Sequence, residues 1–289
     1  MRHGFTLVEL AIVLVIIGLL VGGVLVGQDL IKSAQINAVV SDVQSYTAAA
    51  LTFRDKYGGI PGDLRNDKAA QAGLTVSATS PGITGEGDGD GRLQCCGASN
   101  VGISAALGGE NVLFWRHLSD AGLVAFTSTG TGAAIDTTNF SNTGTEISTL
   151  TPLLPVLRTN AAGFVHVTSA SGLNYFGLAR WSLTAGNASG SMSASPVLTA
   201  REALGIDQKF DDGFPAAGTV VSIAGSLSGA TGTPQNGGDT PLHGNGPSSS
   251  NTVCFDNATR REVYAVSGGL ADTVRCALGD PWRILPDNT

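Results

Sequence analysis

The sequence predicts an α+β fold in which a long N-terminal helix packs on a small antiparallel β-sheet with long loops. The first observation is that residues 10–28 contain no charged side chain, a run longer than the roughly 18 apolar residues that indicate a membrane-spanning helix. The second is an apolar stripe that continues this run as far as Tyr57. The third is a series of short β-branched and aromatic segments in the remainder of the chain, which is typical of strands.

The predicted helix covers residues 5–57 and would be about 80 Å long. Residues 5–28 are apolar on every side, whereas residues 29–58 should lie across the globular part through one apolar face. Gly58, Gly59 and Pro61 end the helix, because glycine accepts a left-handed cap and proline cannot continue the turn. The stripe recurs at steps of three and four: Ile36, Val39, Val40, Val43, Tyr46, Ala50, Phe53 and Tyr57.

Residues 59–289 are expected to form one globular α+β domain. Residues 111–124 are typical of a short amphipathic helix that ends at Gly122, and the side chain of Trp115 is expected in the core. A stretch rich in Gly, Ser, Pro and Asn indicates a long connection over residues 227–250. Strands are predicted at residues 163–168, 173–183, 219–224 and 262–266.

Composition favours an exported, loop-rich protein. Only 13% of the 289 residues are charged while 40 are glycine, so much of the surface must be Ser, Thr, Gly and Asn. The net charge of −7 and pI near 5.0 argue against a broad basic face for nucleic acid.

The four cysteines predict a disulfide rather than a zinc site. No C-x-x-C pair occurs, and no histidine has ligand spacing to a cysteine. An exported location permits disulfides, and a bridge between Cys254 and Cys276 is the favoured pairing, worth roughly 2–4 kcal/mol. Cys95 and Cys96 are adjacent and could instead pair with the later two, so three connectivities stay open.

The N-terminus places one carboxylate, Glu9, at the head of the apolar run, where a buried charge needs a partner. An ordinary signal peptide would have a shorter apolar region with a small-residue cleavage site, and a plain membrane anchor would leave Glu9 unexplained. The surrounding residues are Gly4-Phe5-Thr6-Leu7-Val8-Glu9-Leu10. They resemble the prepilin processing site of type IV pilins and type II secretion pseudopilins.

The resemblance implies that a prepilin peptidase cuts between Gly4 and Phe5 and that the new amine of Phe5 is methylated. Glu9 would then pair with the N-terminus of a neighbouring subunit in a filament. Residues 1–4 would be a leader, kept in the cytoplasm with Arg2 and His3, and the domain would face the periplasm from the inner membrane. The expected function is therefore structural, with other pilin or pseudopilin subunits as partners and no catalysis.

Two features refine this expectation. Many type IV pilins carry a helix-kinking proline in the apolar half, but Pro61 is the first proline here, which favours a pseudopilin. Small-xxx-small spacing, as in residues 18–22 and 23–27, permits close helix packing. The alternative function is a bitopic, membrane-anchored periplasmic protein whose domain binds a ligand. Segments 57–63, 115–123 and 206–215 are also similar to parts of uncharacterised pilin-like proteins, and they imply only a shared domain type.

A glycine-rich acidic loop at residues 85–91 is a candidate calcium site. Glu86, Asp88 and Asp90 offer oxygen ligands at alternating positions, as at the start of a calcium loop. The distal bidentate Glu is missing at the expected spacing, and the alternative is a solvated turn. Asp211-Asp212-Gly213 is expected to be a second turn.

Catalytic motifs are not evident. His117, Ser119 and Asp120 lie close in sequence, but nothing in the sequence supplies an oxyanion hole for a hydrolase. Neither G-x-S-x-G nor H-E-x-x-H occurs.

Overall fold

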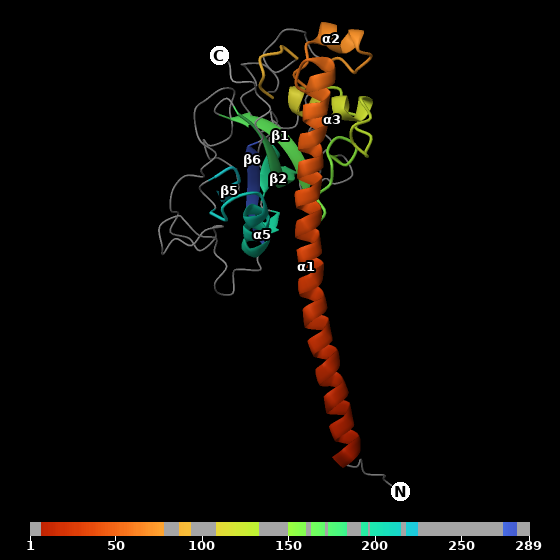
Figure 1. Cartoon of the computed structure of the whole chain (residues 1–289), viewed down its shortest axis with the longest axis vertical. Helices are drawn as coiled ribbons and strands as arrows, with labels where there is room; N and C mark the ends of the chain where they lie inside the picture. The colour runs from red at the N-terminus through yellow and green to blue at the C-terminus, as the bar shows by residue number, and fades with distance from the viewer. Residues whose placement is uncertain are drawn as a thin grey trace.

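The computed structural model describes residues 7–77, 87–93, 108–132, 150–159, 163–170, 173–183, 192–195, 197–214, 218–224 and 274–281. Its dominant element is helix α1, Leu7–Tyr57, which has 51 residues and is therefore about 77 Å long. The N-terminal half of α1 projects away from the other elements, and the C-terminal half runs alongside them (Figure 1). The long helix that the sequence predicts is confirmed.

The C-terminal half of α1 forms one wall of the core. Five of its six buried side chains belong to the predicted stripe, namely Val39, Val40, Val43, Ala50 and Phe53, and Ala49 is buried beside them. The helix ends as expected, because Gly58 adopts a φ of +71° and its N–H donates to the carbonyl oxygen of Arg54 at 2.8 Å.

The sheet is antiparallel at every pairing between its named strands, which confirms the α+β class. Its strand order is β1-β2-β6-β4, with β3 paired to β2 and β5 paired to β6. Strand β1 pairs along its whole length with residues 173–179 of the inner strand β2, so that His166 lies opposite Gly177. The strands are β1 Phe164–Ala170, β2 Leu173–Leu183, β3 Met192–Ser195, β4 Leu198–Thr199, β5 Val221–Ala224 and β6 Val274–Pro281.

Three short helices complete the described structure: α2, Asn66–Gln71; α3, Gly109–Asp120; and α5, Ala200–Phe210. Helix α3 is the one predicted at 111–124, and Gly122 follows it with a φ of +67°. Helix α5 was not predicted. It begins with a capping box in which Thr199 and Glu202 satisfy each other's backbone N–H groups.

Aromatic side chains fill the space between α1, α3 and the β1–β2 pair. Trp115, Phe114, Phe53, Phe164 and Phe176 are all fully buried, so the core position expected for Trp115 is confirmed. The ring of Trp115 meets that of Tyr46 from α1 edge to face, with centroids 5.0 Å apart. Such contacts favour one packing arrangement, and they fix the C-terminal half of α1 to the domain.

The predicted strands at 163–168, 173–183 and 219–224 correspond to β1, β2 and β5. The predicted strand at 262–266 and the predicted connection at 227–250 lie outside the described residues.

Candidate assembly site on helix α1

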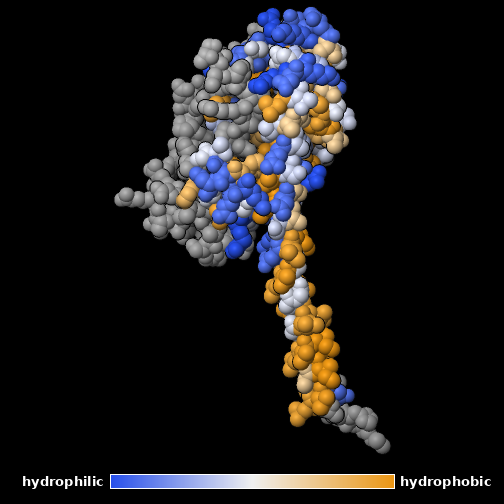
Figure 2. Space-filling model, viewed as in Figure 1, coloured by the Kyte–Doolittle hydropathy of each residue, from blue (hydrophilic) through white to orange (hydrophobic). Residues whose placement is uncertain are grey.

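The N-terminal half of α1 is an exposed apolar surface. Figure 2 shows it as a continuous hydrophobic rod below the mixed surface of the domain. Its large side chains, including Leu7, Leu14 and Leu19, are at least half exposed. In the part of the chain that the structure describes, α1 is a helix long and apolar enough to cross a membrane. A surface of this kind needs lipid or another helix around it.

Glu9 lies in the first turn of α1. The partial positive charge of a helix N-terminus favours a carboxylate there by only about 0.3–1 kcal/mol. Burying that charge in hydrocarbon would cost roughly 3 kcal/mol on lenient insertion scales, which is more than the helix N-terminus offsets. The predicted cleavage residues Gly4 and Phe5 lie outside the described residues.

The glycines of the apolar half are not required by packing within the subunit. A Cβ atom built on Gly18, Gly22, Gly23 or Gly27 would meet nothing within 4 Å. The helix runs through them without a break. Their small size is therefore available for contacts with other molecules.

A second candidate site lies at the opposite end of α1, where three carboxylates gather. Oxygens of Asp63, Asp88 and Glu110 all lie within 4.8 Å of one another, and both Asp63 and Glu110 are buried. Backbone N–H groups of the glycine-rich loop point at them. Gly89 donates to Asp63 Oδ1 at 2.7 Å, Gly91 to Asp63 Oδ2 at 2.8 Å, and Gly87 to Glu110 Oε1 at 2.7 Å.

Electrostatics at this cluster favour a proton or a cation. Burial, as the largest cause, raises the pKa of Asp63 to about 8; the N–H groups of Gly91 and Gly89 oppose the rise, and the charges of Asp90 and Asp88 add to it. Oxygen atoms in such a group could hold calcium. The arrangement also has a structural role, because the carboxylates fasten the loop to α3 and to the end of α1.

The cluster differs from the calcium ligands predicted from sequence. Asp88 belongs to it, but Asp90 does not, and Asp90 instead accepts the N–H of Arg92 at 2.8 Å. Glu86 lies outside the described residues. Sequence reasoning missed Asp63 and Glu110, which lie 22 residues before and 19 residues after the loop; calcium binding stays a prediction.

His117, Ser119 and Asp120 are each engaged in holding a loop against α3. The Nδ1 atom of buried His117 accepts the N–H of Gly62 at 2.9 Å, so Nε2 carries the proton and donates to the carbonyl oxygen of Thr75 at 2.7 Å. Burial lowers the pKa of His117, which keeps the ring neutral.

The other two side chains act similarly. Asp120 Oδ2 accepts from both the N–H and the hydroxyl of Thr75, at 2.9 and 2.7 Å, and Ser119 Oγ accepts the N–H of Ser128 at 3.1 Å. These bonds assign a structural role to all three residues.

The acidic turn predicted at residues 211–213 is present, and it directly follows α5. Gly213 has a φ of +77°, and Asp212 Oδ1 accepts the N–H of Phe214 at 2.8 Å. Asp211 accepts from the N–H and hydroxyl of Thr219, which ties the end of α5 to the approach to β5.

Of the four cysteines, Cys95, Cys96 and Cys254 lie outside the described residues. Cys276 occupies a position in β6 opposite Ala224 of β5 and Leu198 of β4. The Cys254–Cys276 disulfide stays a prediction.

Comparison with known proteins identifies the N-terminal segment. Residues 1–25 match the family model of the prokaryotic N-terminal methylation motif, which is the signature of type IV pilins and pseudopilins. No curated protein and no solved structure gives a significant match. The motif and the apolar half of α1 together are features of an N-terminally processed, membrane-anchored pilin-like protein.

Proposed function

We propose that this chain is a prepilin-like precursor that becomes a structural subunit of a type IV pilus or a type II secretion pseudopilus. The observation that carries the proposal is the methylation motif at residues 1–25, which runs directly into the exposed apolar half of α1. The chain is then a substrate of the prepilin peptidase rather than an enzyme. A membrane-anchored ligand-binding protein is the alternative, but this alternative does not explain the methylation motif or Glu9.

In this mechanism, the precursor waits in the inner membrane as a single-pass protein with its domain in the periplasm. Cleavage after Gly4 exposes the amine of Phe5, which residues 1–4 otherwise block. The methylated amine of one subunit then pairs with Glu9 of a neighbour as the apolar helices bundle. Two buried charges that are paired offset much of each other's desolvation cost.

The two halves of α1 have different roles in this proposal. The N-terminal half supplies lipid-facing surface before assembly and helix-to-helix contacts afterwards. The C-terminal half, through Val39, Val43 and Phe53, is fixed in the domain core. The subunit can therefore move from membrane to filament without unfolding its domain.

Replacing Glu9 tests the pairing step. We expect Glu9→Leu to insert in the membrane and to be cleaved, but to be lost from filaments, because the partner amine would be left buried and unpaired at a cost of roughly 3–5 kcal/mol. Filament yield is measured in a shear fraction, and mass spectrometry of the mature chain should give Phe5 as its methylated first residue.

Asp55→Asn is the matched control, since Asp55 is an exposed carboxylate in the C-terminal half of the same helix. It should assemble like the wild type. Normal assembly of Glu9→Leu would refute the pairing mechanism, and an intact Met1 in the mature wild-type chain would refute processing.

A further inference from the structure

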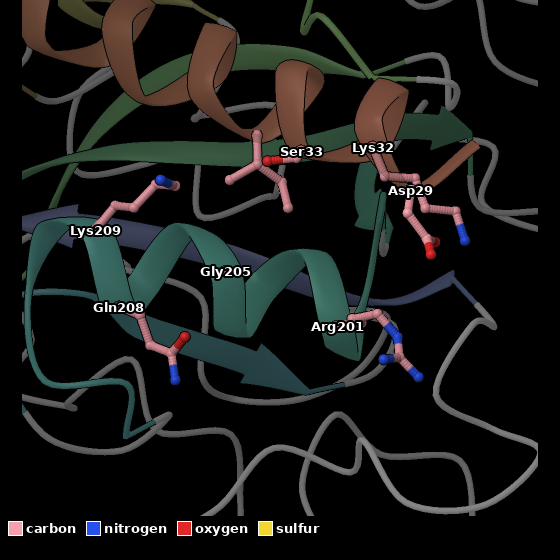
Figure 3. A pocket seen from close by; sticks show the side chains of 8 residues that line it. Asp29, Lys32, Ser33, Arg201, Gly205, Gln208 and Lys209 are labelled. Carbon is pink, nitrogen blue, oxygen red and sulfur yellow. The ribbon is translucent and has the colours of Figure 1, made fainter. Parts of the chain in front are cut away.

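A polar groove lies between α1 and α5, at the edge of the domain from which the apolar half of α1 projects. It has a volume of about 570 Å³, within the range of small-ligand sites. Asp29, Lys32 and Ser33 line it from α1, and Arg201, Gln208 and Lys209 line it from α5 (Figure 3).

The groove lies at the level where α1 leaves a bilayer. From Leu7 to Asp29 the helix rises 22 residues, or about 33 Å, which matches the roughly 30 Å hydrocarbon thickness of a membrane. Asp29 and Lys32 are the first charged residues after the apolar run. If α1 spans the membrane, these side chains and their neighbours on α5 lie among the lipid headgroups.

The charge of the groove is opposite to that of the chain. Lys32, Arg201 and Lys209 contribute three positive charges against one negative charge from Asp29, whereas the whole chain carries a net charge of −7. Cations near a membrane surface attract anionic lipids, and each contributes favourably to the interaction. Ser33 and Gln208 add neutral donors that can bond phosphate oxygens.

Packing holds the two walls of the groove together. A Cβ atom on Gly205 would lie 2.9 Å from Ile36 Cδ1, so the absence of a side chain at Gly205 lets α5 approach α1 closely. The capping box at Thr199 fixes the start of α5, next to Arg201. The cations from the two helices are therefore presented on a preformed surface.

We propose that this groove binds the phosphate of an anionic phospholipid headgroup in the leaflet from which α1 emerges. This inference rests on the proposed insertion of α1 in the membrane. Bound lipid would set the depth and rotation of the subunit while it waits for assembly, and it would have to be released when the helix enters a filament.

The test uses the full chain in nanodiscs of phosphatidylcholine with phosphatidylglycerol at about 3:1, so that the anionic lipid is a minority. Native mass spectrometry then counts the phosphatidylglycerol that each protein retains after release. We expect the Lys32→Gln/Arg201→Gln/Lys209→Gln variant to bind this lipid at least about tenfold more weakly than the wild type. The control is Lys56→Gln/Arg65→Gln/Lys68→Gln, which also removes three positive charges, from the C-terminal end of α1, the N-cap of α2 and α2 itself. It should retain lipid normally.

Three results would overturn the proposal: equal lipid retention by the groove variant and the wild type, equal loss by the control variant, or saturable binding of inorganic phosphate to the groove in lipid-free detergent. Normal lipid retention together with failed filament incorporation in the groove variant would reassign the groove to a neighbouring subunit.

Lipid retention is measured before any assembly. A wild type that retains lipid through the groove but is neither cleaved nor assembled would therefore refute the proposed function and leave this inference standing.

Discussion

At the scale of single residues, the turn after α1 depends on Gly62 and Asp63. Gly62 has a φ of +87° and donates its N–H to His117 on α3. The next residue, Asp63, accepts two N–H groups from the glycine-rich loop. Two adjacent residues therefore join the end of α1 to α3 and to the loop that carries Asp88.

Gly62→Ala should destabilise the domain by about 3 kcal/mol or more, because left-handed strain of 1–2 kcal/mol is added to a steric clash. The new Cβ atom would overlap the carbonyl oxygen of Glu110 and lie 2.8 Å from the backbone nitrogen of Phe114. Gly73→Ala is the control, since Gly73 has a φ of +72° with open space around its Cβ position. It should therefore lose only the 1–2 kcal/mol of left-handed strain. Urea unfolding followed by tryptophan fluorescence measures both, and equal losses would show that the close approach at Gly62 is unimportant.

The raised pKa of Asp63 predicts that the stability of the domain depends on pH. Its pKa is raised from 3.8 to about 8 in the folded chain, so the folded state binds the proton more tightly than the unfolded state. The stabilisation is complete below pH 3.8 and is lost progressively as the pH rises to about 8.

Between pH 6.5 and 8 this loss amounts to about 1.6 kcal/mol, because the slope of 1.36 kcal/mol per pH unit halves as the pH reaches the pKa. Asp63→Asn cannot titrate, so its unfolding free energy should stay flatter across that interval. Asp67→Asn should keep the wild-type slope, because Asp67 is exposed and its pKa is lowered, chiefly by its hydrogen bond with Arg65. Identical slopes for wild type and Asp63→Asn would show that Asp63 is ionised throughout.

At the scale of elements, the sequence pattern predicted the helices and strands that are marked by a long continuous run of residues. The stripe from Ile36 to Tyr57 identified the buried face of α1, and β-branched and aromatic content identified β2 to the residue. Helices α2 and α5 and strands β3, β4 and β6 were missed. The Thr199–Glu202 capping box could have indicated α5, whereas β6, with the sequence VRCALGDP, contains only one β-branched residue and no aromatic residue.

The candidate sites also divide into one that is continuous in sequence and two that the fold assembles from distant residues. The N-terminal motif is continuous in sequence, so it could be predicted from a few residues. The carboxylate cluster is not, because Asp63 and Glu110 reach the loop only after α1 and α3 pack together. The basic groove also joins residues about 170 positions apart, from Lys32 to Arg201, which local patterns do not reveal.

Loss of the N-cap of helix α5 should destabilise the whole helix. Thr199→Ala removes the hydroxyl that accepts the N–H of Glu202 at 3.2 Å, at a cost of about 1 kcal/mol. Amide hydrogen exchange in α5 should then be roughly fivefold faster, while exchange in α3 is unchanged.

The control for this change is Thr52→Ala in α1. Thr52 is exposed and its hydroxyl donates to the carbonyl oxygen of Ala48 within the same helix, and alanine has the higher helix propensity. Amide hydrogen exchange in α1 of the Thr52→Ala variant should stay the same or slow slightly. Faster exchange throughout the domain in Thr199→Ala would mean that α5 unfolds only with the rest of the chain.

At the scale of the whole molecule, one helix serves two environments. The C-terminal half of α1 is stabilised by the core around Trp115, and the N-terminal half has no packing from the described part of the domain. Changes in the N-terminal half should therefore affect assembly without affecting the stability of the domain.

Gly22 separates these two effects. A Cβ atom at Gly22 would meet nothing within 4 Å, and Gly22→Leu raises helix propensity by nearly 1 kcal/mol, so the isolated protein should insert normally and unfold at the wild-type temperature. Filament yield should nevertheless fall, because a large side chain prevents the close approach that the Gly18–Gly22 spacing permits.

Val24→Leu is the matched control, since it enlarges a side chain that is already 59% exposed on the same apolar half, and it should assemble nearly as well as the wild type. Gly22→Ala should lie between the two, because it keeps a small surface. Full assembly of Gly22→Leu would show that neighbouring helices do not meet closely at this face. The glycines would then matter for the flexibility of the helix, and the ordering of the three variants would follow helix propensity instead of side-chain size.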